Sequence, residues 1–297
     1  MPTAKIYRNG ISLSNPHGNP NPPKRGFVTG WSRASARRHT QFLMSVDSDC
    51  LSGGGHSFTL TLRDCPPSAD LWKLLVQSLL ERFRRSGAIR WHWVIEWQRR
   101  GVPHLHGCVW WPKTPPNRGK VDFYLTGKSS VGPPISWWVD IASAYVASPV
   151  AQNSKPIDGV VGWLKYLSKH AARGVSHYQR AGRPSGWDST GRLWGRGGDW
   201  PVVEVVLADD LSMQQFWRFR RLVRSYCKDD VISRVLKSHK APVGPKPRRR
   251  GLARKNPLKE ISSIRRMLRC GDRYLSEVRG LSYWCPDSVS YRFLDLL

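Results

Sequence analysis

Two histidines separated by one residue, His104 and His106, form the group in this sequence best suited to bind a metal ion. Residues 91–111 alternate in the way that predicts two strands joined by a turn. Side chains two positions apart on a strand point the same way, so both imidazoles can reach one ion. The hairpin can fold Glu96 back beside them. Two histidines and one carboxylate leave coordination positions open, as a catalytic metal requires.

A possible nucleophile follows on a predicted helix that runs from Asp158 to about Arg173. Tyr166 and Lys169 lie on its polar side, one turn apart, together with His170. A nearby cation or metal favours the phenolate form of tyrosine, which is the nucleophilic form. The alternative is an amphipathic helix that carries a half-exposed tyrosine and has no chemical role.

The charge of the chain indicates a polyanionic partner. Its 297 residues carry a formal net charge of +27 and have a pI near 10.6, which favours nucleic acid. The residues that we expect to contact DNA are Arg99, Arg100, Arg173, Arg192, Arg248, Arg249 and Arg250. We find no apolar run near the ~18 residues of a membrane span and no secretory signal. The six cysteines include no CxxC pair, so we expect reduced thiols rather than a zinc ribbon or a disulfide scaffold.

Composition divides the chain into three parts. Residues 1–50 are rich in Asn, Pro, Gly and basic residues, and predict a basic, largely irregular arm. Residues 51–236 contain the predicted strands and helices of the main domain, including strands at 57–62 and 202–207 and helices at 68–86 and 135–147. Residues 237–297 predict a basic linker and tail.

Three motifs in order resemble the HUH endonuclease superfamily, and specifically the rolling-circle replication initiators of phages and plasmids. Residues 58–62 (FTLTL) look like the first family motif, residues 103–107 (PHLHG) match its metal motif, and residues 166–169 (YLSK) match its catalytic Tyr-x-x-Lys. Residues 94–104 and 191–195 look like replication proteins of bacteria and filamentous phages. The resemblance covers about residues 57–207.

The resemblance implies an α+β fold, in which a central antiparallel sheet of ferredoxin or RRM type is flanked by helices. It also implies that His104, His106 and Glu96 hold Mg²⁺ or Mn²⁺, with His92 as a second choice for the third ligand. Tyr166 would then nick and rejoin one strand through a 5′-phosphotyrosine, assisted by Lys169. Some phage initiators carry a second tyrosine where this chain has His170, so a single-tyrosine enzyme is implied.

The implied partners are single-stranded or cruciform DNA at a replication origin and a host helicase, in the cytoplasm of a bacterial host. A transposase or mobilisation relaxase of the same superfamily would share the chemistry and differ in the DNA recognised. An alternative of another class is a non-catalytic protein that binds single-stranded DNA or RNA on an RRM-like sheet. That alternative explains the charge and the 15 tryptophans, but not the joint occurrence of the histidine and tyrosine motifs.

Overall fold

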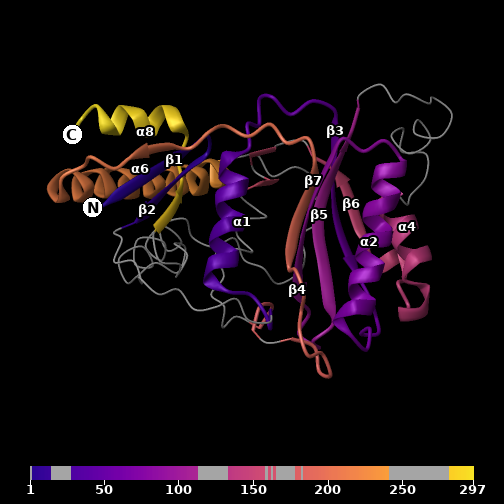
Figure 1. Ribbon diagram of the computed structural model, residues 1–297. Helices are drawn as coiled ribbons and strands as arrows, with labels where there is room; N and C mark the ends of the chain where they lie inside the picture. The colour runs from indigo at the N-terminus through magenta and orange to yellow at the C-terminus, as the bar shows by residue number, and fades with distance from the viewer. Residues whose placement is uncertain are drawn as a thin grey trace. The chain divides into compact units, whose positions relative to one another are not determined.

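A computed structural model describes most of the chain (Figure 1). The described residues are 2–14, 28–112, 133–157, 160–161, 163–164, 178–181, 183–240 and 281–297. They fall into two compact units. One comprises residues 19–203, and the other combines residues 1–18 with residues 204–297.

The unit of residues 19–203 is built on a five-stranded antiparallel sheet with the order β6-β3-β5-β4-β7. Its strands are β3 (Gly54–Thr61), β4 (Arg90–Trp97), β5 (Pro103–Trp111), β6 (Asn153–Pro156) and β7 (Trp194–Gly198). Helix α1 (Arg33–Ser45) covers one face, and α2 (Ala69–Arg85) and α4 (Pro133–Ile141) cover the other (Figure 1). The predicted α+β class, with a central antiparallel sheet and flanking helices, is confirmed.

Helix α2 forms as its sequence predicts. The Ser68 hydroxyl caps it by accepting a hydrogen bond from the Leu71 amide at 3.3 Å. Trp72, Val76, Leu79 and Phe83 recur at helical spacing, and all four are buried. Phe83 packs against Phe58 of β3, which ties the apolar stripe of α2 to the sheet.

Strands β4 and β5 form the predicted hairpin. The turn is closed by a hydrogen bond from the Gln98 amide to the Val102 carbonyl, and Gly101 takes the positive φ (81°) that a side chain would disfavour. Every residue of β4 is buried, because helices cover both faces of the sheet. The two strands of the hairpin therefore lie mostly in the interior of this unit, whereas Arg99 and Arg100 in its turn are exposed.

Within residues 1–50, the described positions 2–14 and 28–50 differ from the predicted irregular arm. Residues 33–45 form α1, capped by Ser32, while β1 (Thr3–Tyr7) and β2 (Gly10–Ser14) pair antiparallel. These strands are short, and their buried alternate residues are interrupted by polar ones. Composition alone therefore did not predict these two strands and this helix, which are stabilised by tertiary packing.

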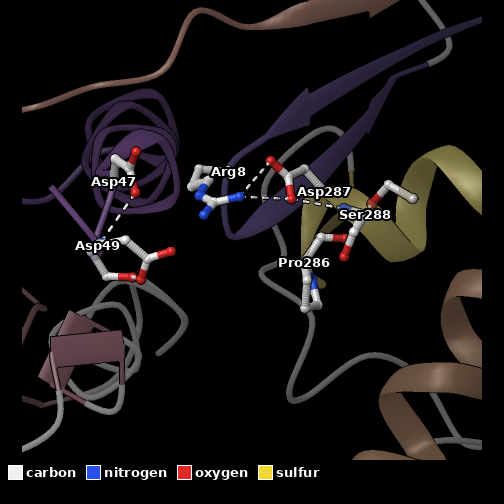
Figure 2. Close-up of polar contacts among 8 residues, drawn as sticks. Arg8, Asp47, Asp49, Pro286, Asp287 and Ser288 are labelled. Carbon is white, nitrogen blue, oxygen red and sulfur yellow. Dashed lines mark hydrogen bonds and ion pairs between the residues drawn. The ribbon is translucent and has the colours of Figure 1, made fainter.

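The second unit has a four-stranded sheet of order β8-β1-β2-β9, with α6 and α8 packed on it. Its later elements are β8 (Val206–Ala208), α6 (Met213–Lys240), β9 (Leu281–Trp284) and α8 (Asp287–Leu294). Arg8, in the turn between β1 and β2, donates from one nitrogen to both carboxylate oxygens of Asp287 at 3.2 and 3.1 Å (Figure 2). That carboxylate also accepts from the Ser288 amide at 2.7 Å, so it fixes the start of α8.

The predicted boundaries at residues 50 and 236 therefore do not coincide with the two units. Two predicted elements have other bounds in the structure. In place of the strand predicted at 202–207, residues 206–208 form a strand that pairs with β1. The helix predicted at 135–147 ends as α4 at Ile141 and continues as the short 3-10 turns η1 (Ser143–Tyr145) and η2 (Pro149–Ala151). Most of the tail predicted from residue 237 lies outside the described residues. Of the helices in the described part, none is long and apolar enough to cross a bilayer.

Candidate active site

The two motif histidines lie on the central strand of the five-stranded sheet. Within β5, His104 and His106 share the face that is turned away from α2. The strand register places Glu96 of β4 directly opposite His104, and Thr59 of β3 directly opposite His106. Side chains opposite one another on neighbouring strands have Cβ atoms ~4.5–5.5 Å apart. The predicted ligands therefore come together on one face, as the sequence indicates.

Their separations define a compact polar cluster. His106 Nε2 lies 3.7 Å from Glu96 Oε2, and the ring centroids of His104 and His106 are 4.3 Å apart at 72°. Glu96 is fully buried and His106 is 5% exposed, while His104 is half-buried. A carboxylate without solvent has a high desolvation cost, which its neighbours in the cluster must offset.

Thr59 fixes the orientation of His106. Its hydroxyl is hydrogen-bonded to His106 Nδ1 at 3.1 Å. When Nδ1 carries the proton in this bond, the lone pair of the imidazole is on Nε2, the nitrogen that faces Glu96. The sequence placed residue 59 in a motif without assigning it a role. Its role follows from the register of β3 against β5.

Arg180 is a member of the cluster that the sequence did not reveal. Its side chain is fully buried, with Nε 3.9 Å from Glu96 Oε1 and the guanidinium 4.2 Å from the centre of the Trp31 ring. The carbonyl of the preceding Gln179 accepts a hydrogen bond from the Trp97 amide, which fixes this segment to the end of β4. No local pattern could show that Arg180 lies beside Glu96, because the two residues are far apart in the chain.

These donors can be compared with the needs of a divalent cation. Two ligand atoms that are each ~2.1 Å from one ion lie ~3.0–3.5 Å apart, close to the 3.7 Å between His106 Nε2 and Glu96 Oε2. Imidazole nitrogen and carboxylate oxygen suit such ions chemically. Among the residues that the structure describes, however, no three His, Cys, Asp or Glu side chains are arranged as a complete metal site. His106 and Glu96 therefore fit as a pair, with His104 beside them.

His92, the second choice for a third ligand, is engaged elsewhere. Its Nε2 lies 3.0 Å from Nε2 of His39 on α1, and both rings are fully buried. Burial, together with the charge of Arg196, lowers the pKa of His92 to about 3, so the ring is neutral. Opposite it on β5, burial raises the pKa of the Cys108 thiol to about 12. This neutral group is distinct from the Glu96 cluster on the same face.

The predicted tyrosine helix is described only in part. Residues 160–161 and 163–164 are helical, and Leu164 is fully buried. The side chain of Trp163 lies against the Cys108 thiol, so this segment packs on the face of the sheet that carries the histidines. The following predicted site residues, Tyr166, Lys169 and Arg173, lie outside the described residues, as do Arg248, Arg249 and Arg250.

The remaining predicted DNA contacts occupy two places. Arg99 is exposed and lies over the ring of Tyr178, 5.6 Å from its centre. Arg100 donates to the carbonyls of Leu62 and Arg63, so its guanidinium holds the end of β3. Arg192 is exposed and lines a cavity on the opposite face of the sheet. The three predicted arginines that the structure describes therefore do not form one surface.

A family model described as replication-associated protein ORF2/G2P matches residues 56–171, the range that holds the histidine cluster and Tyr166. The chain is 40% identical over 305 aligned positions to a putative replication protein of Xylella fastidiosa strain 9a5c, across 99% of this chain and 95% of that protein. The chain belongs to this replication-associated protein family.

Two other relatives match this replication-associated protein over nearly their whole length. A putative replication protein of Xylella fastidiosa strain Temecula1 is 40% identical over 296 positions, across 96% of this chain and 99% of its own. Replication-associated protein G2P of Pseudomonas phage Pf3 is 35% identical over 306 positions, across 100% of this chain and 97% of its own. No solved structure gives a significant match.

Proposed function

We propose that this protein initiates rolling-circle replication by nicking one DNA strand and later rejoining it. The observation that supports this most is the meeting of His104, His106 and Glu96 on one face of the central sheet. Membership of the replication-associated protein family supports the biological setting. The net charge of +27 supports binding of a polyanionic strand.

His104, His106 and Glu96 would hold Mg²⁺ or Mn²⁺. Such an ion would supply Lewis-acid polarisation of a phosphoryl oxygen and stabilisation of the charge in the transition state. When His106 Nδ1 donates to Thr59, the lone pair of the ring lies on Nε2 towards the site, and the charge of Arg180, with Nε 3.9 Å from Glu96 Oε1, balances that of the Glu96 carboxylate. The buried positions of Glu96 and His106 keep bulk water away from these side chains.

Tyr166 is the proposed nucleophile. Its phenolate oxygen attacks phosphorus, so one Tyr–O–P bond forms and the bond from phosphorus to the 3′ oxygen breaks. The products are a 5′-phosphotyrosine and a free 3′-hydroxyl, which takes up a proton as the phenol loses one. Lys169 holds the phosphate or assists removal of the phenol proton. Attack by a 3′-hydroxyl on the phosphotyrosine reverses the step and rejoins the strand.

The substrate is an unpaired or extruded strand at a replication origin, because a phosphodiester inside a duplex cannot reach a recessed tyrosine. The sequence has no helicase motif, so strand separation falls to a host helicase. The unpaired strand is bound mainly through its phosphates, which gives an affinity that falls steeply with salt.

A covalent-adduct assay tests the proposal. The full-length protein is incubated with single-stranded DNA of its own replicon, with Mn²⁺ or with EDTA, and analysed on a denaturing gel. We expect a protein–DNA band with Mn²⁺ that EDTA abolishes and that Tyr166→Phe does not form. Tyr178→Phe is the matched control, because Tyr178 is an exposed tyrosine on the segment that carries Arg180.

Each other outcome contradicts a defined part of the proposal. A band that persists in Tyr166→Phe and vanishes in Tyr178→Phe would transfer the nucleophile to residue 178. Tight DNA binding with no band on any strand of the replicon would favour a non-catalytic binding protein. Nicking confined to transposon ends or to a transfer origin would favour a transposase or a relaxase.

A further inference from the structure

A cavity of about 550 Å³ lies on the face of the five-stranded sheet that is opposite the histidine cluster. Its walls are α2, strands β4 and β7, and the loop of residues 189–192. This volume falls within the ~300–1,000 Å³ of typical small-ligand pockets. Every lining residue belongs to the unit of residues 19–203.

The cavity has a strong excess of positive charge. Four cationic residues line it, and Asp70 is the only acidic residue among its lining residues. The cationic residues are Lys73, Arg84, Arg192 and Arg196, but the Arg196 guanidinium lies over Phe42 on the opposite face, so three of the four charges face the cavity. Lys73, Arg84 and Arg192 are exposed, and Arg84 is also paired with the Glu81 carboxylate at 2.7 Å, so a ligand phosphate would have to compete with that carboxylate for Arg84. Such a ring of cations favours a ligand with several negative charges, of which a nucleic-acid backbone is the obvious example.

The floor of the cavity is apolar and aromatic. Trp93 and Ile95 of β4 line it together with Val76 and Leu80 of α2. Trp93 pairs across the sheet with Gly195 of β7, and a Cβ at that glycine would lie 2.7 Å from the indole ring. The glycine therefore lets the indole lie against the β7 backbone. Trp93 is 8% exposed, so a nucleobase in the cavity would contact a small part of the indole, next to the cations that would meet its phosphates.

The position of the cavity connects it to the proposed reaction. Strand β7 is at the edge of the sheet as described, and Arg196 on this strand extends its guanidinium over Phe42 of α1, on the histidine face. Arg192, in the loop before β7, and Arg196, on β7, therefore place a basic side chain on each face of the sheet at this edge. A DNA strand bound at the histidine face would have to pass around this edge to reach the cavity.

We propose that this cavity binds an unpaired nucleotide of the DNA strand that flanks the processed phosphodiester. Lys73, Arg84 and Arg192 contact its phosphates, and Trp93 contacts its base. The inference rests on the proposed function for the identity of the strand, but the site is separate from the histidine cluster. It also gives a physical role to Arg192, which the sequence predicted to contact DNA.

The salt dependence of binding tests the phosphate contacts. A short fluorescein-labelled single-stranded oligonucleotide is titrated with the full-length protein in EDTA, at several salt concentrations. For Lys73→Gln/Arg192→Gln, we expect weaker binding and a slope of log K against log salt that is smaller by about 1.4, or ~0.7 for each lost phosphate contact. Arg85→Gln is the control, because Arg85 is exposed on the same helix and does not line the cavity.

Photocrosslinking tests the location. An oligonucleotide carrying 5-iododeoxyuridine is irradiated on the wild-type protein, and we expect crosslinked peptides from residues 69–84 or 189–196. An unchanged salt slope in the double variant, or crosslinks confined to other peptides, would overturn the proposal. More effective competition by a duplex or by RNA of the same sequence would overturn the assignment to unpaired DNA.

The two proposals can fail separately. If the adduct forms while the salt slope and crosslinks exclude the cavity, only the cavity proposal fails. If the cavity binds the strand while no adduct forms on any replicon strand, the nicking proposal fails and the cavity remains a DNA-binding site.

Discussion

Thr59 shows how much of the candidate site depends on a single hydroxyl. It bonds His106 at Nδ1, on the side of the ring away from the nitrogen that faces Glu96. Hydrogen bonds of this kind orient a metal ligand, and their loss typically lowers metal affinity ~10–100-fold. The role of His106 in the proposed site therefore depends on a residue that binds no metal itself.

We expect Thr59→Val to weaken Mn²⁺ binding by ~10–100-fold, measured by calorimetric titration of the protein without DNA. Ser57→Ala is the control, because the Ser57 hydroxyl lies on the same strand but donates to the Lys155 carbonyl at 3.0 Å. Equal Mn²⁺ affinity in Thr59→Val and wild type would show that this hydroxyl does not support a metal ligand.

Between elements, α1 and β4 are joined by the contact of two buried imidazoles, His39 and His92. The pKa of His92 is lowered to about 3 in the folded protein, from an ordinary value of 6.5. Between these values the unfolded chain binds a proton that the folded protein excludes. His92 therefore does not reduce the free energy of unfolding above about pH 6.5. As the pH falls from 6.5 towards 3, it lowers that free energy by up to ~1.4 kcal/mol per pH unit.

Urea unfolding at about pH 7 and about pH 5 checks this expectation, with the free energy of unfolding lower at the acidic pH. The variant His39→Leu/His92→Leu removes both rings together, so that neither polar partner stays buried alone. Its loss of stability on acidification should be smaller than that of wild type, whatever its stability at neutral pH. An identical loss in both proteins would assign the pH dependence to other groups.

The sheet itself is assembled from aromatic residues that lie opposite glycines. Trp110 is paired with Gly55, Trp93 with Gly195, and Trp91 with Gly197. A Cβ at Gly55 would lie 2.4 Å from the Trp110 indole. Indoles on this sheet therefore lie across the backbone of a neighbouring strand, in a position that any larger residue would block.

This packing predicts different effects for two adjacent glycines of β3. Gly55→Ala forces the Trp110 indole to move and should lower the free energy of unfolding by ~1–3 kcal/mol. Gly54→Ala meets no atom within 4 Å and should change stability little, or raise it slightly. Urea unfolding of both variants measures the difference. Equal stabilities would contradict the role given to the Trp110–Gly55 pair.

Across the whole molecule, the sequence predicted the helices and strands whose apolar residues recur at regular spacing. Ser68 and the apolar stripe after it predicted α2, and alternation predicted the hairpin that brings Glu96 to His104. It could not predict contacts between residues distant in the chain, such as Arg180 with Glu96. It also missed β1 and β2, because short strands in a Pro- and Asn-rich segment depend on partners that lie elsewhere in the chain.

The pairing of β2 with β9 has a consequence for the synthesis of the protein. Ribosomes add about 5–20 residues per second, so residues 281–284 emerge roughly 15–50 s after residues 10–14. In that interval the five-stranded sheet can complete itself from residues 54–198, while the edge of β2 stays open. Open strand edges pair readily with other chains. A chain that terminates before residue 281 would leave β2 as the edge and would lack the core residues Cys285 and Val289, so premature termination is a route to aggregation even when the candidate active site has formed.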